Sequence, residues 1–262
     1  MPSGVSADRA GEAARFMREH AHYRDDIPFW LAQARRLGSP VLDLGCAAGR
    51  VALALAAAGH EVWALDGSRE MLAELASGAR AAGVGGRVRT VRADMRDFSL
   101  GRRFPLVVIA MNTLQALVDP EDQLSCLRRV RDHLAPGGEL AFDVALPDPG
   151  EIAAGLGRER PGGAWTDPAT GATLAHSAWY DTWDPVTQTL EFTHRIAETA
   201  PGGGPPREYL RRHRVHLFMP VEMDHLLARA GLETVALMGD FAGGPLRDGG
   251  ETQIRRCRAA AT

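Results

Sequence analysis

The sequence predicts an α/β protein built on a parallel β-sheet, with an antiparallel β insertion in its second half. Over the first 146 residues, short apolar runs alternate with longer amphipathic stretches, which is the pattern of repeated βαβ units. After Pro149, polar and apolar residues alternate instead, as is typical of antiparallel strands. The length of 262 residues suits one large domain, or one domain that carries an insertion.

The first part of the chain supplies the strands and helices of the parallel sheet. The expected strands are residues 40–44, 61–66, 87–93, 105–110 and 139–145. The expected helices are residues 24–37, 49–58, 68–82 and 121–134. Ser68 is the expected N-cap of the third helix, because a serine oxygen can accept a hydrogen bond from the first helical turn. Pro136 and the two glycines after it end the fourth helix.

The second part of the chain supplies the insertion and then returns to the core. The expected insertion strands are residues 173–181, 187–198 and 207–218, and the breakers are the Pro- and Gly-rich residues 161–171 and 201–206. A helix over residues 221–230, closed by Gly231, precedes apolar runs at residues 233–238 and 253–257. The expected organisation is therefore an α/β core with N-terminal helices (1–149), a β-rich insertion (150–219) and a C-terminal completion of the core (220–262).

Composition places the protein among ordinary globular chains. Apolar residues make up 45% and charged residues 24%, which argues against disorder and fibres. A net charge of -3 provides no overall positive field to attract nucleic acid or an anionic membrane. No apolar run reaches the roughly 18 residues of a membrane span. The N-terminal segment carries Asp8 and Glu12 and lacks a long apolar core, so it does not resemble a secretory signal. Because Cys46, Cys126 and Cys257 are widely scattered, we expect free thiols and a cytoplasmic protein.

Small residues follow the first predicted strand in the segment VLDLGCAAGR, residues 41–50. A turn of small residues between a strand and a helix lets a ligand approach the backbone. Dinucleotide-binding enzymes place G-x-G-x-x-G at the same point. Here the small residues are Gly45, Ala47 and Gly49, with Asp43 two positions ahead of the first. This spacing favours S-adenosylmethionine over a dinucleotide.

Other strands of the predicted sheet also end in polar or sulfur-containing residues. Asp66 ends the second strand, where its carboxylate could accept two hydrogen bonds from a ribose diol. Asp94 and Met95 follow the third strand and could bind the amino group and the ring of adenine. Met111 and Asn112 follow the fourth strand. All of these residues project beyond the carboxyl ends of the strands, where open α/β sheets bind ligands.

With these motifs, the chain resembles the class I S-adenosylmethionine-dependent methyltransferases of the bacterial small-molecule type, over about residues 20–258. The resemblance rests on VLDLGCAAGR, the acidic end of EVWALD, RADM, FPLVVIAMNTLQAL and LRRVRDHLAPGGELAFDV. It implies a Rossmann-like sheet of seven strands with the last strand antiparallel. Ala47 departs from the family pattern, in which a second glycine is usual.

The resemblance also implies which residues hold S-adenosylmethionine and its product, S-adenosylhomocysteine. Tyr23 matches an aromatic residue that often closes over the cofactor in this family. Together with the residues at the strand ends, the predicted cofactor-binding residues are Tyr23, Asp43, Gly45, Ala47, Gly49, Asp66, Gly67, Asp94, Met95, Met111 and Asn112. Structural roles stay open for several of them, since Asp43 could cap a helix and Asn112 could satisfy the backbone where a strand stops.

The acceptor site is predicted to lie under the insertion, which we expect to form a lid. Methyl transfer needs the nucleophile at about 3 to 3.5 Å from the methyl carbon, opposite the sulfur. An amine acceptor needs little further help, whereas a phenol or alcohol benefits from a general base. The candidate catalytic residues are His194, which alternation places on an apolar face with Phe192, and Tyr180 on the preceding strand. The structural alternative is that His194 is a core histidine whose hydrogen bonds are made by neighbouring residues.

The expected function is methyl transfer to a nitrogen or oxygen atom of a small molecule, with secondary metabolites among the candidates. The alternatives are a nucleotide-dependent oxidoreductase, a nucleic-acid methyltransferase and a non-catalytic cofactor-binding protein. The segment after the fourth strand, residues 112–115, lacks the Pro-Pro-aromatic pattern of many nucleic-acid methyltransferases. We expect no metal, because the acidic residues near 119–122 suit a helix start. We also expect a monomer or homodimer, without nucleic-acid or membrane partners.

Overall fold

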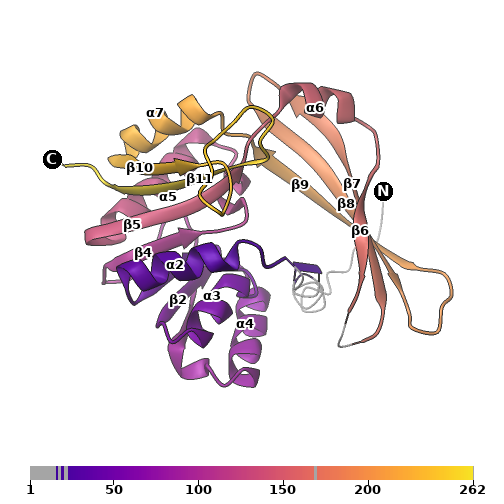
Figure 1. Ribbon diagram of the computed structural model, residues 1–262, viewed down its shortest axis with the longest axis horizontal. Coiled ribbons are helices and arrows are strands. Elements are labelled where there is room, and N and C mark those ends of the chain that lie inside the picture. Colours follow the sequence, from indigo (N-terminus) through magenta and orange to yellow (C-terminus); the bar gives the residue numbers. More distant parts are fainter. Residues whose placement is uncertain (1–15, 17–18, 21–22, 168–169, 262) are drawn as a thin grey trace.

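The computed structural model describes residues 16, 19–20, 23–167 and 170–261. The N-terminal segment in which no secretory signal is expected lies almost entirely outside these residues. Within the described residues, the strands form two sheets (Figure 1). The larger sheet has seven strands in the order β10-β11-β5-β4-β1-β2-β3. Strand β11 runs antiparallel to both of its neighbours, so the predicted methyltransferase-type sheet with an antiparallel last strand is confirmed.

Helices and strands alternate along the core as the periodicity predicts. In chain order they are α2 (Ile27–Leu37), β1 (Val41–Leu44), α3 (Arg50–Ala57), β2 (Val62–Asp66), α4 (Arg69–Ala81), η1 (Gly85–Arg87), β3 (Val88–Arg92), β4 (Phe104–Ile109), η2 (Thr113–Ala116), α5 (Pro120–His133), β5 (Leu134–Ala145), α7 (Pro220–Ala230), β10 (Leu232–Met238) and β11 (Thr252–Ala259). Because β2, β1, β4 and β5 pair in parallel, their carboxyl ends lie at one edge of the sheet.

Local signals fix several of the helix ends. The Ser68 hydroxyl accepts a hydrogen bond from the backbone N–H of Met71 at 3.2 Å, which confirms the predicted N-cap of α4. The Asp119 side chain likewise accepts from the N–H of Glu121 and begins α5. Gly231 ends α7 with a φ of 76°, a left-handed conformation that glycine adopts without steric cost. These caps confirm predictions made from single residues.

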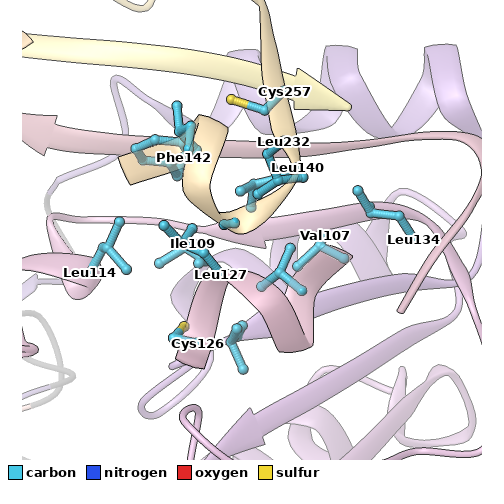
Figure 2. Packing of buried hydrophobic residues seen from close by; sticks show 14 of the residues in the cluster. Val107, Ile109, Leu114, Cys126, Leu127, Leu134, Leu140, Phe142, Leu232 and Cys257 are labelled. Carbon is cyan, nitrogen blue, oxygen red and sulfur yellow. The ribbon is translucent and has the colours of Figure 1, made fainter. Parts of the chain in front are cut away.

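Two apolar clusters hold the helices on the two faces of the large sheet. Helices α2, α3 and α4 pack on one face and α5 and α7 on the other. Figure 2 shows the second face, where Leu127 of α5 lies below Leu140 and Phe142 of β5. Cys257 of β11 belongs to the same cluster. All three cysteines are free, as the sequence predicts, and the structure buries all three.

The insertion forms a separate antiparallel sheet in the order β6-β7-β8-β9, beside the carboxyl edge of the core (Figure 1). Its elements are α6 (Pro149–Gly155), β6 (Arg160–Thr166), β7 (Thr173–Asp184), β8 (Thr189–Thr199) and β9 (Arg207–His216). We call this small sheet the lid. No helix within the described ranges is long and apolar enough to cross a membrane.

The insertion contains two elements that the sequence does not predict, the helix α6 and the strand β6. The expectation of a break over residues 161–171 is therefore wrong for its first part. Strand β6 lies at the edge of the lid, and its pairing with β7 is irregular between Pro161 and Gly163. An edge strand tolerates proline, because no neighbouring strand needs the missing N–H on its outer side.

Candidate active site

The turn between β1 and α3 is shaped by its glycines. Gly45 and Gly49 have φ angles of 73° and 89°, which side chains rarely adopt. A Cβ atom on Gly45 would lie 2.4 Å from Cγ2 of Thr113, and one on Gly49 would lie 2.1 Å from Cδ1 of Leu75. Ala47 lies between them with a φ of 46°, a conformation that is uncommon for a non-glycine residue. The turn therefore presents closely packed backbone to the carboxyl edge of the sheet.

Asp66 connects the end of β2 to this turn. One of its carboxylate oxygens accepts a hydrogen bond from the N–H of Ala47 and the other from the N–H of Ser68, both at 2.8 Å. Each carboxylate oxygen can accept a second hydrogen bond. The side chain therefore keeps the acceptor capacity that a ribose diol needs, in an orientation fixed by the backbone.

Asp43 is a buried carboxylate at the base of the same turn. It is 2% exposed, and its Oδ2 has no hydrogen-bond partner among the residues that the structure describes. Burial raises the pKa of Asp43 to about 7, although the nearby charge of Arg50 opposes this shift. A buried acceptor without a partner is costly, and a cationic ligand group would satisfy it. The ammonium group in the methionine part of S-adenosylmethionine has this chemistry.

Two adjoining cavities run along the carboxyl edge of the sheet. The smaller, of about 340 Å³, is lined by Asp43, Gly49 and Arg50 among others. The larger, of about 1290 Å³, extends from Asp66 at the end of β2 to His194 of the lid. Gly45, Ala47, Met111 and Thr113 line both cavities. The turn after β1 and the turn after β4 thus form part of the wall that the two cavities share, together with Phe16 and His20.

Most of the predicted cofactor residues meet at these cavities. Those that line the larger cavity are Gly45, Ala47, Asp66, Gly67, Asp94, Met95, Met111 and Asn112. Asp43 and Gly49 line the smaller one. The carboxylate of Asp94 is held by the guanidinium of Arg96 at 2.6 Å, and hydrogen bonds from Arg96 hold the pKa of Asp94 below its usual value. Asp94 is therefore ionised at the rim of the cavity, and both of its oxygens already accept hydrogen bonds from Arg96.

Tyr23 and Tyr180 lie outside this group of residues. The backbone carbonyl of Tyr23 accepts a hydrogen bond from Arg50, whose guanidinium lies 5.1 Å from the centre of the tyrosine ring. Burial raises the pKa of Tyr23 to about 12, so its hydroxyl stays protonated. Tyr180 lines a separate cavity of about 390 Å³, together with Leu190 and Leu217. The structure does not bring Tyr180 together with the predicted cofactor residues.

The lid contributes aromatic and imidazole rings to the wall of the larger cavity. His194 of β8 and His213 of β9 lie 4.9 Å apart between ring centres, and Phe192 stacks on His213 at 4.8 Å. All three line the cavity. Burial and the neighbouring His213 lower the pKa of His194 to about 3. Burial also lowers the pKa of His213, so both imidazoles are neutral at pH 7.

Sequence reasoning missed two buried acids that support the site. Asp26 is fully buried and binds the guanidinium of Arg50 through both oxygens, at 2.5 and 2.6 Å. It also accepts a hydrogen bond from the indole of Trp30. Asp143 is buried in β5 and binds the turn after β4. A charged residue inside the apolar strand segment LAFDVA is the signal that could have found Asp143, because aspartate is rarely buried without a partner.

The strand order, the glycine turn and the acidic ends of β1 and β2 define a class I S-adenosylmethionine-dependent methyltransferase. A family model described as a methyltransferase domain matches residues 41–138. The CcbJ methyltransferase of Streptomyces caelestis is 30% identical with a TM-score of 0.74, and the match covers 92% of this chain and 98% of that one. The chain belongs to the family of S-adenosylmethionine-dependent methyltransferases, whose cofactor is S-adenosylmethionine.

Two curated relatives match about half of the chain. The cypemycin N-terminal methyltransferase of a Streptomyces species is 34% identical over 140 residues, which is 50% of this chain and 56% of that protein. The trans-aconitate 2-methyltransferase of Streptomyces avermitilis is 32% identical over 150 residues, or 55% of this chain and 53% of that protein. The chain thus spans about half the length of the curated relatives it matches.

Replacing Asp66 with alanine should weaken binding of S-adenosylhomocysteine by roughly 1.5 to 3 kcal/mol, the range for hydrogen bonds to a charged group. The loss has two sources, because the carboxylate both faces the cavity and holds the N–H of Ala47. Titration calorimetry measures the affinity. Asp97→Ala is the matched control, since the Asp97 side chain is 80% exposed and pairs with Arg129. Unchanged affinity in Asp66→Ala would remove the ribose assignment.

Proposed function

We propose that this protein transfers the methyl group of S-adenosylmethionine to a small-molecule acceptor bound under the lid. The cavity of about 1290 Å³ carries this proposal, because it joins Asp66 and Met95 to Phe192 and His194. Its volume exceeds the roughly 300 to 1,000 Å³ of most small-molecule sites, so it offers room for a cofactor and an acceptor together. Residues 150–219, which include the lid, are then the part of the chain that selects the acceptor.

The bound cofactor supplies a methyl group on a sulfonium centre, which is already electrophilic. The protein therefore contributes mainly by positioning and by excluding water. Asp66 holds the ribose, and the Gly45 turn lies along the methionine part, where Asp43 can accept from the ammonium group. The lid then covers the opposite side of the cavity with Phe192 and His194.

A nitrogen acceptor suits this site better than an alcohol. Among the described residues, nothing hydrogen-bonds to the ring of His194, so its nitrogens are available to an acceptor in the cavity. An imidazole whose pKa is about 3 cannot keep a proton taken from an alcohol at neutral pH. A neutral amine needs no such base, because it attacks through its lone pair and its product loses a proton to water. The related cypemycin N-terminal methyltransferase supports transfer to nitrogen.

Replacing His194 with phenylalanine should raise the KM for the acceptor by about three- to tenfold, the value of one ordinary hydrogen bond. Affinity for S-adenosylhomocysteine should not change. Because its pKa is lowered to about 3, His194 stays neutral above about pH 4 and is protonated only below that. Near pH 6.5, the pH profile of kcat/KM should therefore have the same shape in the variant and in the wild-type protein.

His225→Phe is the control for this experiment, since His225 is an exposed residue of α7. It should leave both KM and kcat unchanged. An unchanged acceptor KM in His194→Phe would contradict the role of His194 in holding the acceptor. Loss of an inflection near pH 6.5 would instead indicate that His194 is a general base.

The function as a whole is tested in two steps. Thermal unfolding is measured with S-adenosylhomocysteine, NAD and NADP, and only the first should stabilise the protein. Release of S-adenosylhomocysteine is then measured with a panel of small amines, phenols and carboxylic acids, and we expect turnover with amines. Stabilisation by a dinucleotide alone would favour an oxidoreductase. Binding of S-adenosylhomocysteine without turnover of any acceptor would favour a non-catalytic protein.

A further inference from the structure

Asp143 is a buried acid in the middle of the large sheet. It is 4% exposed and lies in β5, between β4 on one side and β11 on the other. Its two carboxylate oxygens accept hydrogen bonds from consecutive backbone N–H groups, those of Met111 at 2.7 Å and Asn112 at 3.1 Å. Burying a carboxylate is unfavourable unless such partners satisfy it. The arrangement therefore indicates a specific role for Asp143 in the turn that follows β4.

This turn has an unusual backbone. Met111 and Asn112 have φ angles of 61° and 58°, so two consecutive non-glycine residues adopt the left-handed region. Such a conformation is unfavourable for side-chain-bearing residues and persists only where the surrounding structure holds it. Consecutive N–H groups in a tight turn form a concave site for an acceptor, and the side chain of Asp143 occupies that site. The carboxylate thus holds the turn in place.

The turn lies where the proposed cofactor and acceptor would meet. Met111 lines both cavities, and Asn112 lines the larger one. The next residue, Thr113, packs against Gly45, since its Cγ2 lies 2.4 Å from the position of an added Cβ. A shift of this turn would therefore alter the glycine turn as well. Asp143 itself lines neither cavity.

We propose that Asp143 is a positioning residue, which fixes the turn after β4 and thereby aligns the acceptor with the methyl donor without contacting either. The proposal rests on the proposed function. It differs from a merely structural role, in which loss of the carboxylate would lower stability and leave the remaining folded protein fully active.

Asp143→Asn tests the proposal. The amide has the same shape, but only one oxygen can accept, and its NH2 group then faces the second backbone N–H. We expect kcat at saturating substrates to fall on the order of 100-fold, because a small misplacement of the reacting groups has an effect of this size. Hydrogen exchange at the amides of Met111 and Asn112 should become faster. The dissociation constant of S-adenosylhomocysteine should rise less than about tenfold, because Asp66 and Asp43 are retained.

Gln253→Met is the matched control. Gln253 is fully buried on the neighbouring strand β11, and its side-chain amide donates to the carbonyl of Phe218 at 2.7 Å. The substitution removes this hydrogen bond and the one that Gln253 accepts from Nε of Arg255 at 3.3 Å, and neither of them involves the turn after β4. Gln253 pairs with Val144, the residue that follows Asp143. It should lower the melting temperature and leave kcat unchanged, so it separates lost stability from lost alignment.

Two results would overturn the proposal. The first is a kcat of Asp143→Asn within about threefold of the wild-type value, when it is measured well below the melting temperature. The second result comes from the wild-type protein alone. It is hydrogen exchange at the amides of Met111 and Asn112 that is as fast as at exposed loop amides. If the wild-type protein turns over no acceptor, the proposed function fails. Comparing amide exchange in the wild-type protein and in Asp143→Asn still decides whether Asp143 holds the turn.

Discussion

Replacing Gly45 with valine is expected to abolish detectable binding of S-adenosylhomocysteine. The new Cβ would stand 2.4 Å from Cγ2 of Thr113, and the φ of 73° is an outlier for a β-branched residue. The added methyl groups would also enter the wall that the two cavities share. Together these effects should weaken binding by at least about 3 kcal/mol, or more than 100-fold, which titration calorimetry measures directly.

Gly59→Val is the control that separates backbone strain from contact. Gly59 has a φ of 97°, but an added Cβ would meet nothing within 4 Å. The control should therefore lose stability and keep its affinity for S-adenosylhomocysteine. Wild-type affinity in Gly45→Val would show that the glycine turn does not face the cofactor.

Replacing Arg50 with methionine should lower the free energy of unfolding by about 3 to 5 kcal/mol, the cost of breaking a buried ion pair. Asp26 is fully buried and binds the guanidinium of Arg50 through both of its oxygens. Without Arg50, the charge of Asp26 has no counterion, and the nearby buried Asp43 also loses its cationic neighbour. Urea denaturation at pH 8, followed by circular dichroism, measures the effect.

Two further variants show whether the uncompensated charge is the cause. Adding Asp26→Asn to Arg50→Met removes that charge, so the double variant should recover much of the lost stability. Arg129→Met removes an ion pair in which the arginine side chain is 42% exposed and its partner, Asp97, is 80% exposed. It should cost about 1 kcal/mol or less, as exposed pairs do. A similar loss in Arg50→Met and Arg129→Met would contradict the buried-pair argument.

The sequence by itself determined the core of this protein, because the signals for that core are local. Strand and helix periodicities depend on neighbouring residues, as do the caps at Ser68 and Gly231. Parallel pairing alone places the residues that follow β1, β2 and β3 at one edge of the sheet, so the sequence is sufficient to assign Asp66 and Met95 to one site. The alternation along β8 also put Phe192 and His194 on the face that lines the cavity.

Only the tertiary structure decided which side chains meet across long distances in the chain. Alternation along β7 predicts on which face of the strand Tyr180 lies, but not what packs against that face. The structure places Tyr180 at a separate cavity. Asp26 belongs to no motif, and the motif that contains Asp143 does not show what Asp143 binds, since their partners lie 24 and 32 residues away and are brought near by helix packing and strand order. Local sequence specifies backbone conformation, whereas the pairing of buried charges depends on the packing of the whole sheet.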